Sequence, residues 1–305
     1  MDHGDHMDNR LLVTLLTAAG LLATGLPTPA QARPARGDAL LVSTHSATYA
    51  MDPRTGRIIR QIADGSDGVV SPQRRRVAFA RDLDACFPDP PDGGCSASKD
   101  LLTARLDGSA ERVIVRNREE RSSMRGPDWS PDGRRIAFHW GTPGERALAI
   151  VNADGTGLRP LVPGAPDGTF SPDGTRIAYS QNDNIHVVDV ATGATRAVTT
   201  DGSANGTVPD WSPDGEHILY AGNTEFFTVP AEGGPSIGSG QWPRQVYMIS
   251  ALVVSPDGRR VAFAATDESA PDGTAVSRVY LANRDGSGLT ALAEGHYELT
   301  DWIGL

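Results

Sequence analysis

A four-residue motif that returns at nearly constant spacing constrains the fold of this chain more than any other feature. The sequence Ser-Pro-Asp-Gly begins at Ser130, Ser171, Ser212 and Ser255, and a degenerate copy, Ser-Pro-Gln-Arg, begins at Ser71. The five serines are separated by 59, 41, 41 and 43 residues. A period of about 40 to 45 residues is the length of one four-stranded β-propeller blade. The spacing therefore predicts a ring of such blades.

The residues between two copies of the motif also repeat. After Ser130-Pro-Asp-Gly come short apolar runs at 135–139, 147–152 and 158–162, with the turn Asp154-Gly155 between the last two. Glycine in such turns supplies the positive φ that tight hairpins need. Each repeat therefore predicts an antiparallel meander of four strands. The second strands of the other repeats are expected at Arg76 to Ala80, Arg176 to Ser180, His217 to Ala221 and Arg260 to Ala264.

The two ends of the repeat region together supply one further blade. Ala39 to Ser43 resembles the second strand of a repeat, but no first strand precedes it. Thr300-Asp301-Trp302 resembles the first strand that contains Pro127-Asp128-Trp129. We expect the C-terminal strand to join the N-terminal blade, which closes the ring and leaves no open sheet edge. The expected fold is all-β: a six-bladed β-propeller of four-stranded antiparallel blades over residues 38–305.

The repeat is similar to that of a known family. The run from Pro127 to Phe138, PDWSPDGRRIAF, and the turn Asn152-Ala-Asp-Gly-Thr-Gly resemble the WD-like repeats of the TolB propeller family. TolB itself carries an extra N-terminal domain before its propeller and works with envelope partner proteins. The residues before 38 are too few for that domain, so the resemblance covers the propeller part alone. It implies the fold and leaves the function open.

The first 32 residues have the features of a signal peptide. An apolar run from Leu11 to Leu26 is followed by Ala30-Gln-Ala32, a small-residue cleavage site of the A-x-A type. Cleavage before Arg33 would leave a short linker, 33–37, in front of the propeller. The apolar run is too short for a membrane anchor, so we expect export without membrane insertion, to the cell envelope or the medium. The acidic residues before the run suggest that Met7, rather than Met1, is the start.

The net charge excludes some classes of binding partner, and the two cysteines predict a disulfide. Removing residues 1–32 removes three Asp and one Arg, so the net charge changes from −10 to −8. A domain this acidic is a poor electrostatic partner for nucleic acid or anionic lipid. Cys86 and Cys95, the two cysteines, lie in a loop-like stretch of an exported chain, where one local disulfide is expected. We expect a monomer.

A ligand is expected on the face that gathers the long loops, away from the Ser-Pro-Asp-Gly turns. His139-Trp140 stands where sister repeats have small residues, and this pair is either a ligand platform or a plug in a wide channel. Aromatic and polar residues on neighbouring blade crossings suit a sugar or a peptide, although aromatic residues more commonly anchor loops. The candidate ligand-binding residues are His139, Trp140, Trp242, Arg244, Tyr247, His296 and Tyr297.

Three aspartates occupy the same place on three innermost strands: Asp128, Asp210 and Asp301. Carboxylates that converge on a channel could hold a hard cation such as Ca²⁺. The alternative is that each accepts a hydrogen bond from the adjacent blade, and this reading is favoured. Trp129, Trp211 and Trp302, which follow these aspartates, are expected to be core wedges.

The leading functional hypothesis is an exported, non-enzymatic binding protein that recognises a protein, peptide or glycan on the loop face. The rival is a small secreted hydrolase or lyase acting in the central funnel, with or without a metal held by the three aspartates. Propellers of serine peptidases work with a separate catalytic domain that carries Gly-x-Ser-x-Gly, and this sequence has no such motif. No catalytic residues can be assigned from spacing.

Overall fold

The computed structural model describes residues 37–89, 94–117, 123–142, 144–204, 208–222, 225–239, 246–267 and 275–304, although not the side chains of residues 84–89, 94–97 and 247. The predicted signal peptide and residues 33–36 of the linker lie outside this part of the chain and stay predictions. The described part contains 24 strands and no helix. It accordingly contains no helix that is long and apolar enough to cross a membrane.

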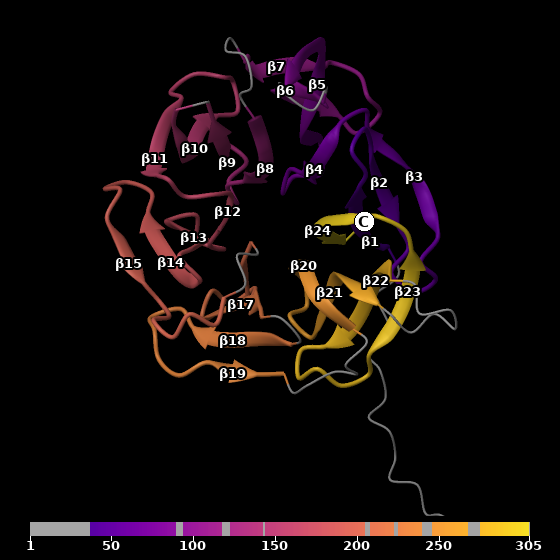
Figure 1. Ribbon diagram of the computed structural model, residues 1–305, viewed down its shortest axis with the longest axis vertical. Coiled ribbons are helices and arrows are strands. Elements are labelled where there is room, and N and C mark those ends of the chain that lie inside the picture. Colours follow the sequence, from indigo (N-terminus) through magenta and orange to yellow (C-terminus); the bar gives the residue numbers. More distant parts are fainter. Residues whose placement is uncertain are drawn as a thin grey trace, which may run out of the picture. The chain divides into compact units, whose positions relative to one another are not determined.

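The strands form six antiparallel sheets of four strands, arranged as blades around a common centre (Figure 1). Blade 1 contains β24 (Glu298–Gly304), β1 (Asp38–Ser43), β2 (Thr48–Met51) and β3 (Ile58–Ala63). Blade 2 contains β4 (Ser66–Val70), β5 (Arg76–Asp89), β6 (Gly94–Arg105) and β7 (Arg112–Val115). Blade 3 contains β8 (Ser123–Trp129), β9 (Arg135–Gly141), β10 (Arg146–Asn152) and β11 (Arg159–Pro163).

The remaining blades follow the same order from the inside outward. Blade 4 contains β12 (Gly168–Phe170), β13 (Arg176–Gln181), β14 (Asn184–Asp189) and β15 (Thr195–Ala197). Blade 5 contains β16 (Asp210–Trp211), β17 (His217–Ala221), β18 (Phe226–Pro230) and β19 (Ile237–Gly238). Blade 6 contains β20 (Val246–Val254), β21 (Arg260–Asp267), β22 (Val276–Asn283) and β23 (Thr290–Glu294). The predicted six-bladed propeller is confirmed.

The ring closes through β24, the last strand. It pairs antiparallel with β1, with Leu40 opposite Trp302 and Ser43 opposite Glu298, so the two ends of the repeat region share blade 1 (Figure 1). Each innermost strand then contacts the innermost strand of the next blade, all the way round. The predicted closure is confirmed, and the innermost strands surround a central channel.

The Ser-Pro-Asp-Gly motif is the turn between the first and second strands of a blade. In blade 3 the buried Ser130 hydroxyl donates to Asp132 Oδ1 at 2.6 Å and accepts from the Arg135 amide at 2.9 Å. The Gly133 amide donates to the Ser130 carbonyl at 2.8 Å, and Gly133 has φ +67°. The motif therefore encodes a hydrogen-bonded turn that needs a left-handed residue at its fourth position.

The three repeat tryptophans lie in the core between blades, as expected. Trp129 is buried and packs between Val69 of blade 2 and Phe138 of its own blade. Its indole Nε1 donates to the Val69 carbonyl at 3.2 Å. Trp211 makes the equivalent bond to the Thr169 carbonyl at 3.0 Å. Trp129 and Trp211 therefore tie neighbouring blades together by packing and by a hydrogen bond, whereas the buried Nε1 of Trp302 has no partner among the described residues.

Blade 2 differs from the expectation at its second and third strands. The stretch that holds Cys86 and Cys95 was expected to be loop-like, but β5 continues to Asp89 and pairs there with β6, which begins at Gly94. Proline and glycine within the stretch suggested a loop, yet the two backbones stay paired. Cys86 lies opposite Ala97, and Cys95 lies opposite Pro88. The cysteine side chains lie outside the described residues, so the disulfide stays a prediction.

Candidate functional site

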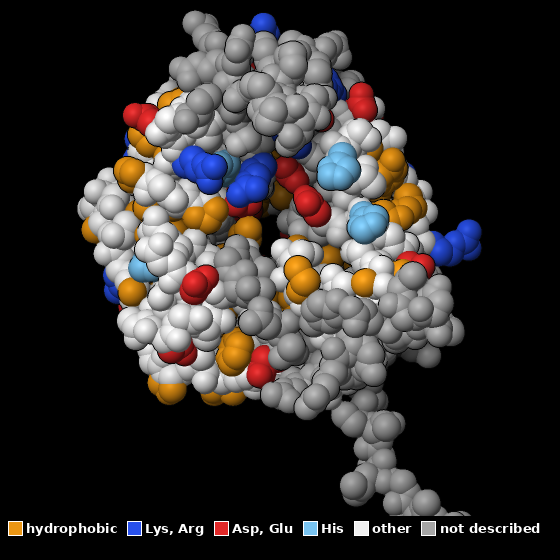
Figure 2. Space-filling model, viewed as in Figure 1, with side chains coloured by type: hydrophobic (Ala, Val, Ile, Leu, Met, Phe, Trp, Pro, Cys, Tyr) orange, Lys and Arg blue, Asp and Glu red, His pale blue; other side chains and the backbone are white. Residues whose placement is uncertain are grey.

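Five charged side chains gather where the innermost strands begin, at one end of the central channel. We call them the mouth cluster: Asp67, Lys99, Arg125, Asp167 and Glu298. They come from four blades. Glu298 lies in β24 of blade 1, and blade 2 contributes Asp67 from β4 and Lys99 from β6. Arg125 lies in β8 of blade 3, and Asp167 directly precedes β12 of blade 4. Figure 2 shows acidic and basic side chains side by side around a hollow at the middle of the ring.

Irregular strand pairing places these side chains at the mouth. The register shifts between Ser66 and Val69 of β4, and the intervening Asp67 has φ +57°. A similar shift follows Arg125 in β8, where Gly126 has φ +54°. Bulges of this kind turn a strand locally and redirect its side chains. The mouth cluster is therefore a product of bulged innermost strands.

Gly126 allows two of the acids to approach closely. Its amide donates to the carboxylate of Asp67. A Cβ at this position would lie 2.2 Å from Asp167 Oδ2. Any larger residue at 126 would therefore displace Asp167, and its backbone would be strained at φ +54°. Across the mouth, Asp167 Oδ1 lies 3.9 Å from Arg125 Nε.

Asp67 and Glu298 form a carboxyl pair. Burial raises the pKa of both groups. The charge of Asp67 further raises the pKa of Glu298, and the charge of Asp167 further raises the pKa of Asp67. A hydrogen bond joins the two side chains, with Glu298 as the donor; it raises the pKa of Glu298 and opposes the rise at Asp67. The ammonium of Lys99 partly offsets this rise. It also donates to Ser66 Oγ at 2.9 Å.

The three predicted channel aspartates join alternate blades to their neighbours. Asp128 Oδ2 of blade 3 accepts from the Phe170 amide of blade 4 at 2.7 Å. Asp210 Oδ2 of blade 5 accepts from the Val254 amide of blade 6 at 2.7 Å. Asp301 of blade 1 accepts from the Val70 amide of blade 2. We call these three residues the aspartate ring, and their bonding follows the favoured alternative, an acceptor for the adjacent blade.

The aspartate ring also concentrates acid in the channel. Burial, and then the charges of Asp301 and Asp210, raise the pKa of Asp128 to about 8. Burial raises the pKa of Asp301 to about 7, with help from the charge of Asp210. Burial raises the pKa of Asp210 to about 6. In each case the carboxylate accepts hydrogen bonds from backbone amides, and these bonds oppose the rise in pKa.

The aspartate ring is not a compact set of metal ligands in this structure. Among the described residues, one group of three or more His, Cys, Asp or Glu brings its ligand atoms within 4.8 Å of one another, and it lies elsewhere, at Asp214, Glu216 and His217. To bind Ca²⁺ together, the three aspartate side chains would have to move away from the backbone amides that donate hydrogen bonds to them. Calcium at this place stays a prediction.

His139 and Trp140 differ in their exposure to solvent. His139 is buried in β9, and burial lowers its pKa to about 4, helped by the charges of Arg125 and Arg146. Trp140 is half-buried and packs on the core between blades 2 and 3. Whether the pair serves as a ligand platform or as a plug stays a prediction.

The other predicted ligand residues are distributed unevenly. His296 is exposed, and Tyr297 is half-buried against the core between blades 1 and 6. Both lie directly before Glu298, so they border the mouth cluster. Trp242 and Arg244 lie outside the described residues, as does the side chain of Tyr247, whose backbone belongs to β20. Their role as ligand residues stays a prediction.

Sequence reasoning missed all five members of the mouth cluster, Asp67, Lys99, Arg125, Asp167 and Glu298. Their shared signal is a position two or three residues before the residue equivalent to Asp128 on each innermost strand. Lys99, the single lysine of the chain, does not share this signal, because it lies in β6, the third strand of blade 2 counted from the channel. The bulges that bring these residues together depend on pairing with the neighbouring strand, which a sequence does not display.

Comparison with known proteins gives a family and a fold. Residues 93–299, more than half of the chain, match the model of the TolB beta propeller domain. The Tol-Pal system protein TolB of Anaeromyxobacter dehalogenans is 32% identical over 118 residues, which are 37% of this chain and 26% of that protein. The chain thus aligns with about a quarter of the length of this curated relative.

Two solved structures have the same architecture. The putative TolB from Agrobacterium tumefaciens superposes with a TM-score of 0.60 at 18% identity, covering 84% of this chain and 88% of that one. TolB from Acinetobacter baumannii gives a TM-score of 0.64 at 14% identity, covering 87% of this chain and 66% of that one. At such identities the likeness concerns the fold. With the family model matched over more than half of its length, this chain belongs to the TolB β-propeller domain family.

Proposed function

We propose that this protein is an exported binding protein that recognises a protein partner through the loop face of its propeller. Within the broader class of protein, peptide or glycan ligands, a protein is favoured because the matched relatives are components named for the Tol-Pal system. The observation that carries the proposal is the mouth cluster. Four blades contribute charged side chains to one place, where a rigid ring holds them.

The chemistry of the mouth favours a partner group that is cationic or rich in hydrogen-bond donors. Three carboxyl groups face two cations there, and the aspartate ring adds three further carboxyl groups deeper in the channel. A lysine, an arginine or a free amino terminus of a partner chain would stabilise the charged form of these acids. The partner would therefore present an extended basic segment to the mouth.

Capture of partners by the immobilised mature protein tests this proposal. Bait variants Asp67→Asn and Glu298→Gln are compared with Glu232→Gln, an acid 77% exposed at the turn after β18 and remote from the mouth. Proteins retained by the wild type should be lost or reduced about tenfold by the mouth variants and kept by Glu232→Gln. Equal retention by all baits would remove the mouth cluster from the proposal.

Export is the second part of the proposal, and it rests on the signal-peptide features of residues 1–32. Protein recovered from the envelope or the medium of an expressing bacterium should begin at Arg33. N-terminal sequencing gives the result directly. Cytoplasmic protein that begins at Met1 or Met7 would contradict export. Light scattering on the same material checks the expected monomer.

A hydrolase or lyase is the second candidate, and the Asp67–Glu298 pair is the observation that favours it. A carboxyl whose pKa is raised by burial and by a neighbouring carboxylate can serve as a general acid. Turnover by the mature protein across a panel of polysaccharides and esters, abolished by Glu298→Gln and kept by Glu232→Gln, would support catalysis. Absence of turnover, and absence of bound Ca²⁺ by metal analysis, would leave the binding function alone.

A further inference from the structure

One Ser-Pro-Asp-Gly turn differs in charge from its sisters. In blades 3, 4 and 6 the motif is followed by Arg134-Arg135, Thr175-Arg176 and Arg259-Arg260. In blade 5 it is followed by Glu216-His217. Compared with its sisters, the turn between β16 and β17 therefore has a carboxylate and an imidazole in place of arginine. They lie beside Asp214, the aspartate of the motif.

The sister arginines have a structural task that His217 does not share. Arg176 lies over the ring of Trp211 in the next blade, with its guanidinium carbon 5.0 Å from the ring centre. Arg260 lies over Trp302 at 4.8 Å, and Arg135 lies over Phe170 at 5.7 Å. The residue at the matching place in blade 6 is Val254. Because Val254 is not aromatic, residue 217 has no ring to cover, and arginine is not needed there for packing.

The imidazole of His217 has an unused donor–acceptor atom. Its Nδ1 is buried and has no hydrogen-bond partner among the residues that the structure describes. A buried polar atom without a partner is costly, and in native proteins it commonly indicates an interaction with water or an ion. This observation is independent of the two neighbouring carboxylates.

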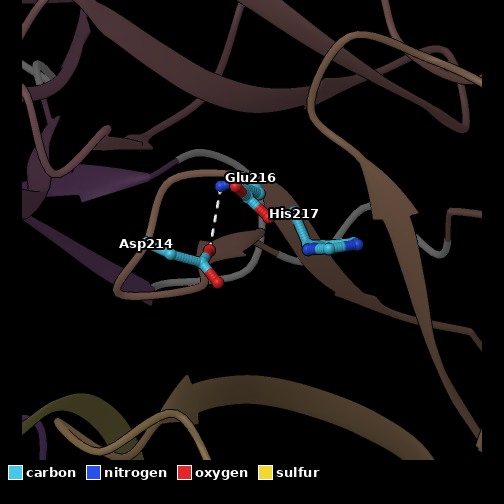
Figure 3. A group of neighbouring side chains, drawn as sticks. All are labelled: Asp214, Glu216 and His217. Carbon is cyan, nitrogen blue, oxygen red and sulfur yellow. Dashed lines mark hydrogen bonds between the residues drawn. The ribbon is translucent and has the colours of Figure 1, made fainter.

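The three side chains lie close enough to act on one ion. One ligand atom each from Asp214, Glu216 and His217 lies within 4.8 Å of the other two, and Figure 3 shows all three rising from a single turn. Asp214 Oδ1 already accepts from the Ser212 hydroxyl at 2.5 Å and from the Glu216 amide at 2.9 Å, which fixes its orientation. Its Oδ2 accepts no bond from the described part of the chain. The exposed Glu216 side chain is free to rotate toward the other two.

We propose that Asp214, Glu216 and His217 bind a divalent transition metal ion, with Zn²⁺ as the preferred ion. Zinc takes imidazole nitrogen and carboxylate oxygen as ligands, and three protein ligands leave its fourth position for water or for a group from a second molecule. Arg284 of blade 6 is the cation that acts on Asp214 from the neighbouring blade, and it limits the affinity of the site. The site lies at the opposite end of the innermost strands from the mouth cluster, so it is independent of the proposed partner binding.

Titration of the metal-free full-length chain with Zn²⁺, followed by calorimetry, tests the proposal. His3 and His6 near the N-terminus are replaced by glutamine in every protein, because they could bind zinc themselves. Two variants adopt residues that sister turns carry, His217→Arg and Glu216→Arg, so both should fold. His45→Gln removes an exposed histidine from another part of the chain and is the matched control.

The parent and His45→Gln should bind one Zn²⁺ per chain in a saturable manner, and both turn variants should lose this binding. Co²⁺ in place of Zn²⁺ should give visible absorption bands that disappear with His217→Arg. Circular dichroism confirms that each variant is folded. Failure of the parent to bind, or equal binding by His217→Arg and the parent, would overturn the proposal.

Discussion

The fourth residue of the repeated turn adopts a left-handed backbone conformation in every blade that has the motif. In four blades this residue is glycine, and the values of φ lie between +67° and +72°. In blade 2 the same place is held by Arg74, which adopts φ +55°. The hydrogen bond from its amide to the Ser71 carbonyl, at 2.7 Å, keeps the turn in shape despite the side chain. This blade therefore bears a backbone strain that its sisters avoid.

Replacing Arg74 by glycine should stabilise the protein. Relief of the left-handed conformation contributes about 1–2 kcal/mol, and the added freedom of the unfolded chain costs about 0.4–1 kcal/mol, so a net gain of about 0.5–1 kcal/mol is expected. Urea unfolding measures the change. Arg75→Gly, at an exposed neighbour without positive φ, should give no gain. A gain of equal size in both variants would refute the strain.

At the scale of the element, β24 depends on one large side chain. Trp302 is 4% exposed and packs between blade 1 and blade 6, against Leu40 and Val253 among others. Arg260 of blade 6 covers its ring. The strand that closes the ring is therefore held by packing on both sides as well as by its ladder with β1.

Trp302→Ala should destabilise the fold by about 3–5 kcal/mol, because it leaves a cavity at the junction of the first and last blades. Ile237→Ala, which truncates a hydrophobic side chain 71% exposed in β19, should change the free energy of unfolding by less than about 0.5 kcal/mol. Both are measured by urea unfolding. Similar small losses in the two variants would show that β24 is not needed for closure.

At the scale of the whole molecule, the closed ring brings together acids that are far apart in the sequence. The aspartate ring comes from blades 1, 3 and 5, and each member bonds to the following blade. Closing the ring also buries three carboxyl groups, which is the main reason why their pKa values are raised; the neighbouring carboxylates add to the rise at Asp128 and Asp301. The same groups therefore link the blades and oppose one another once they are ionised.

This conflict predicts a pH dependence of stability. The folded protein keeps a proton on Asp128 up to a pKa of about 8, whereas the unfolded chain releases it near the usual value of 3.8. The free energy of unfolding should therefore fall as pH rises between these values, by up to about 1.4 kcal/mol per pH unit for this group. In Asp128→Asn the fall between pH 5 and pH 7.5 should be shallower.

Urea unfolding at several pH values gives the slopes for wild type and variant. Asp183→Asn is the control, because it removes an exposed carboxyl at a position where asparagine also tolerates the observed φ of +57°. Its slope should match that of the wild type. If Asp128→Asn also kept the wild-type slope, burial in the channel would not perturb this acid.

The sequence by itself determined the blade, the number of blades and the closure by the last strand. These depend on local chemistry, a turn that needs its serine, aspartate and glycine, and on a period that any reader can count. Trp129, Trp211 and Trp302 were placed correctly because each follows the same motif position. The sequence also predicts a ligand at the end of the ring away from the regular turns, and this stays a prediction.

Only the tertiary structure decided which side chains meet there. The bulges at Asp67 and Gly126 turn their strands toward the channel mouth, and a bulge exists only in relation to the paired strand. The sequence left His139 as either a ligand platform or a plug, and only its neighbours in space show that it is buried. Repeats specify the ring because they act between neighbours in sequence. The mouth cluster joins residues from four blades, and their proximity follows from the closed ring.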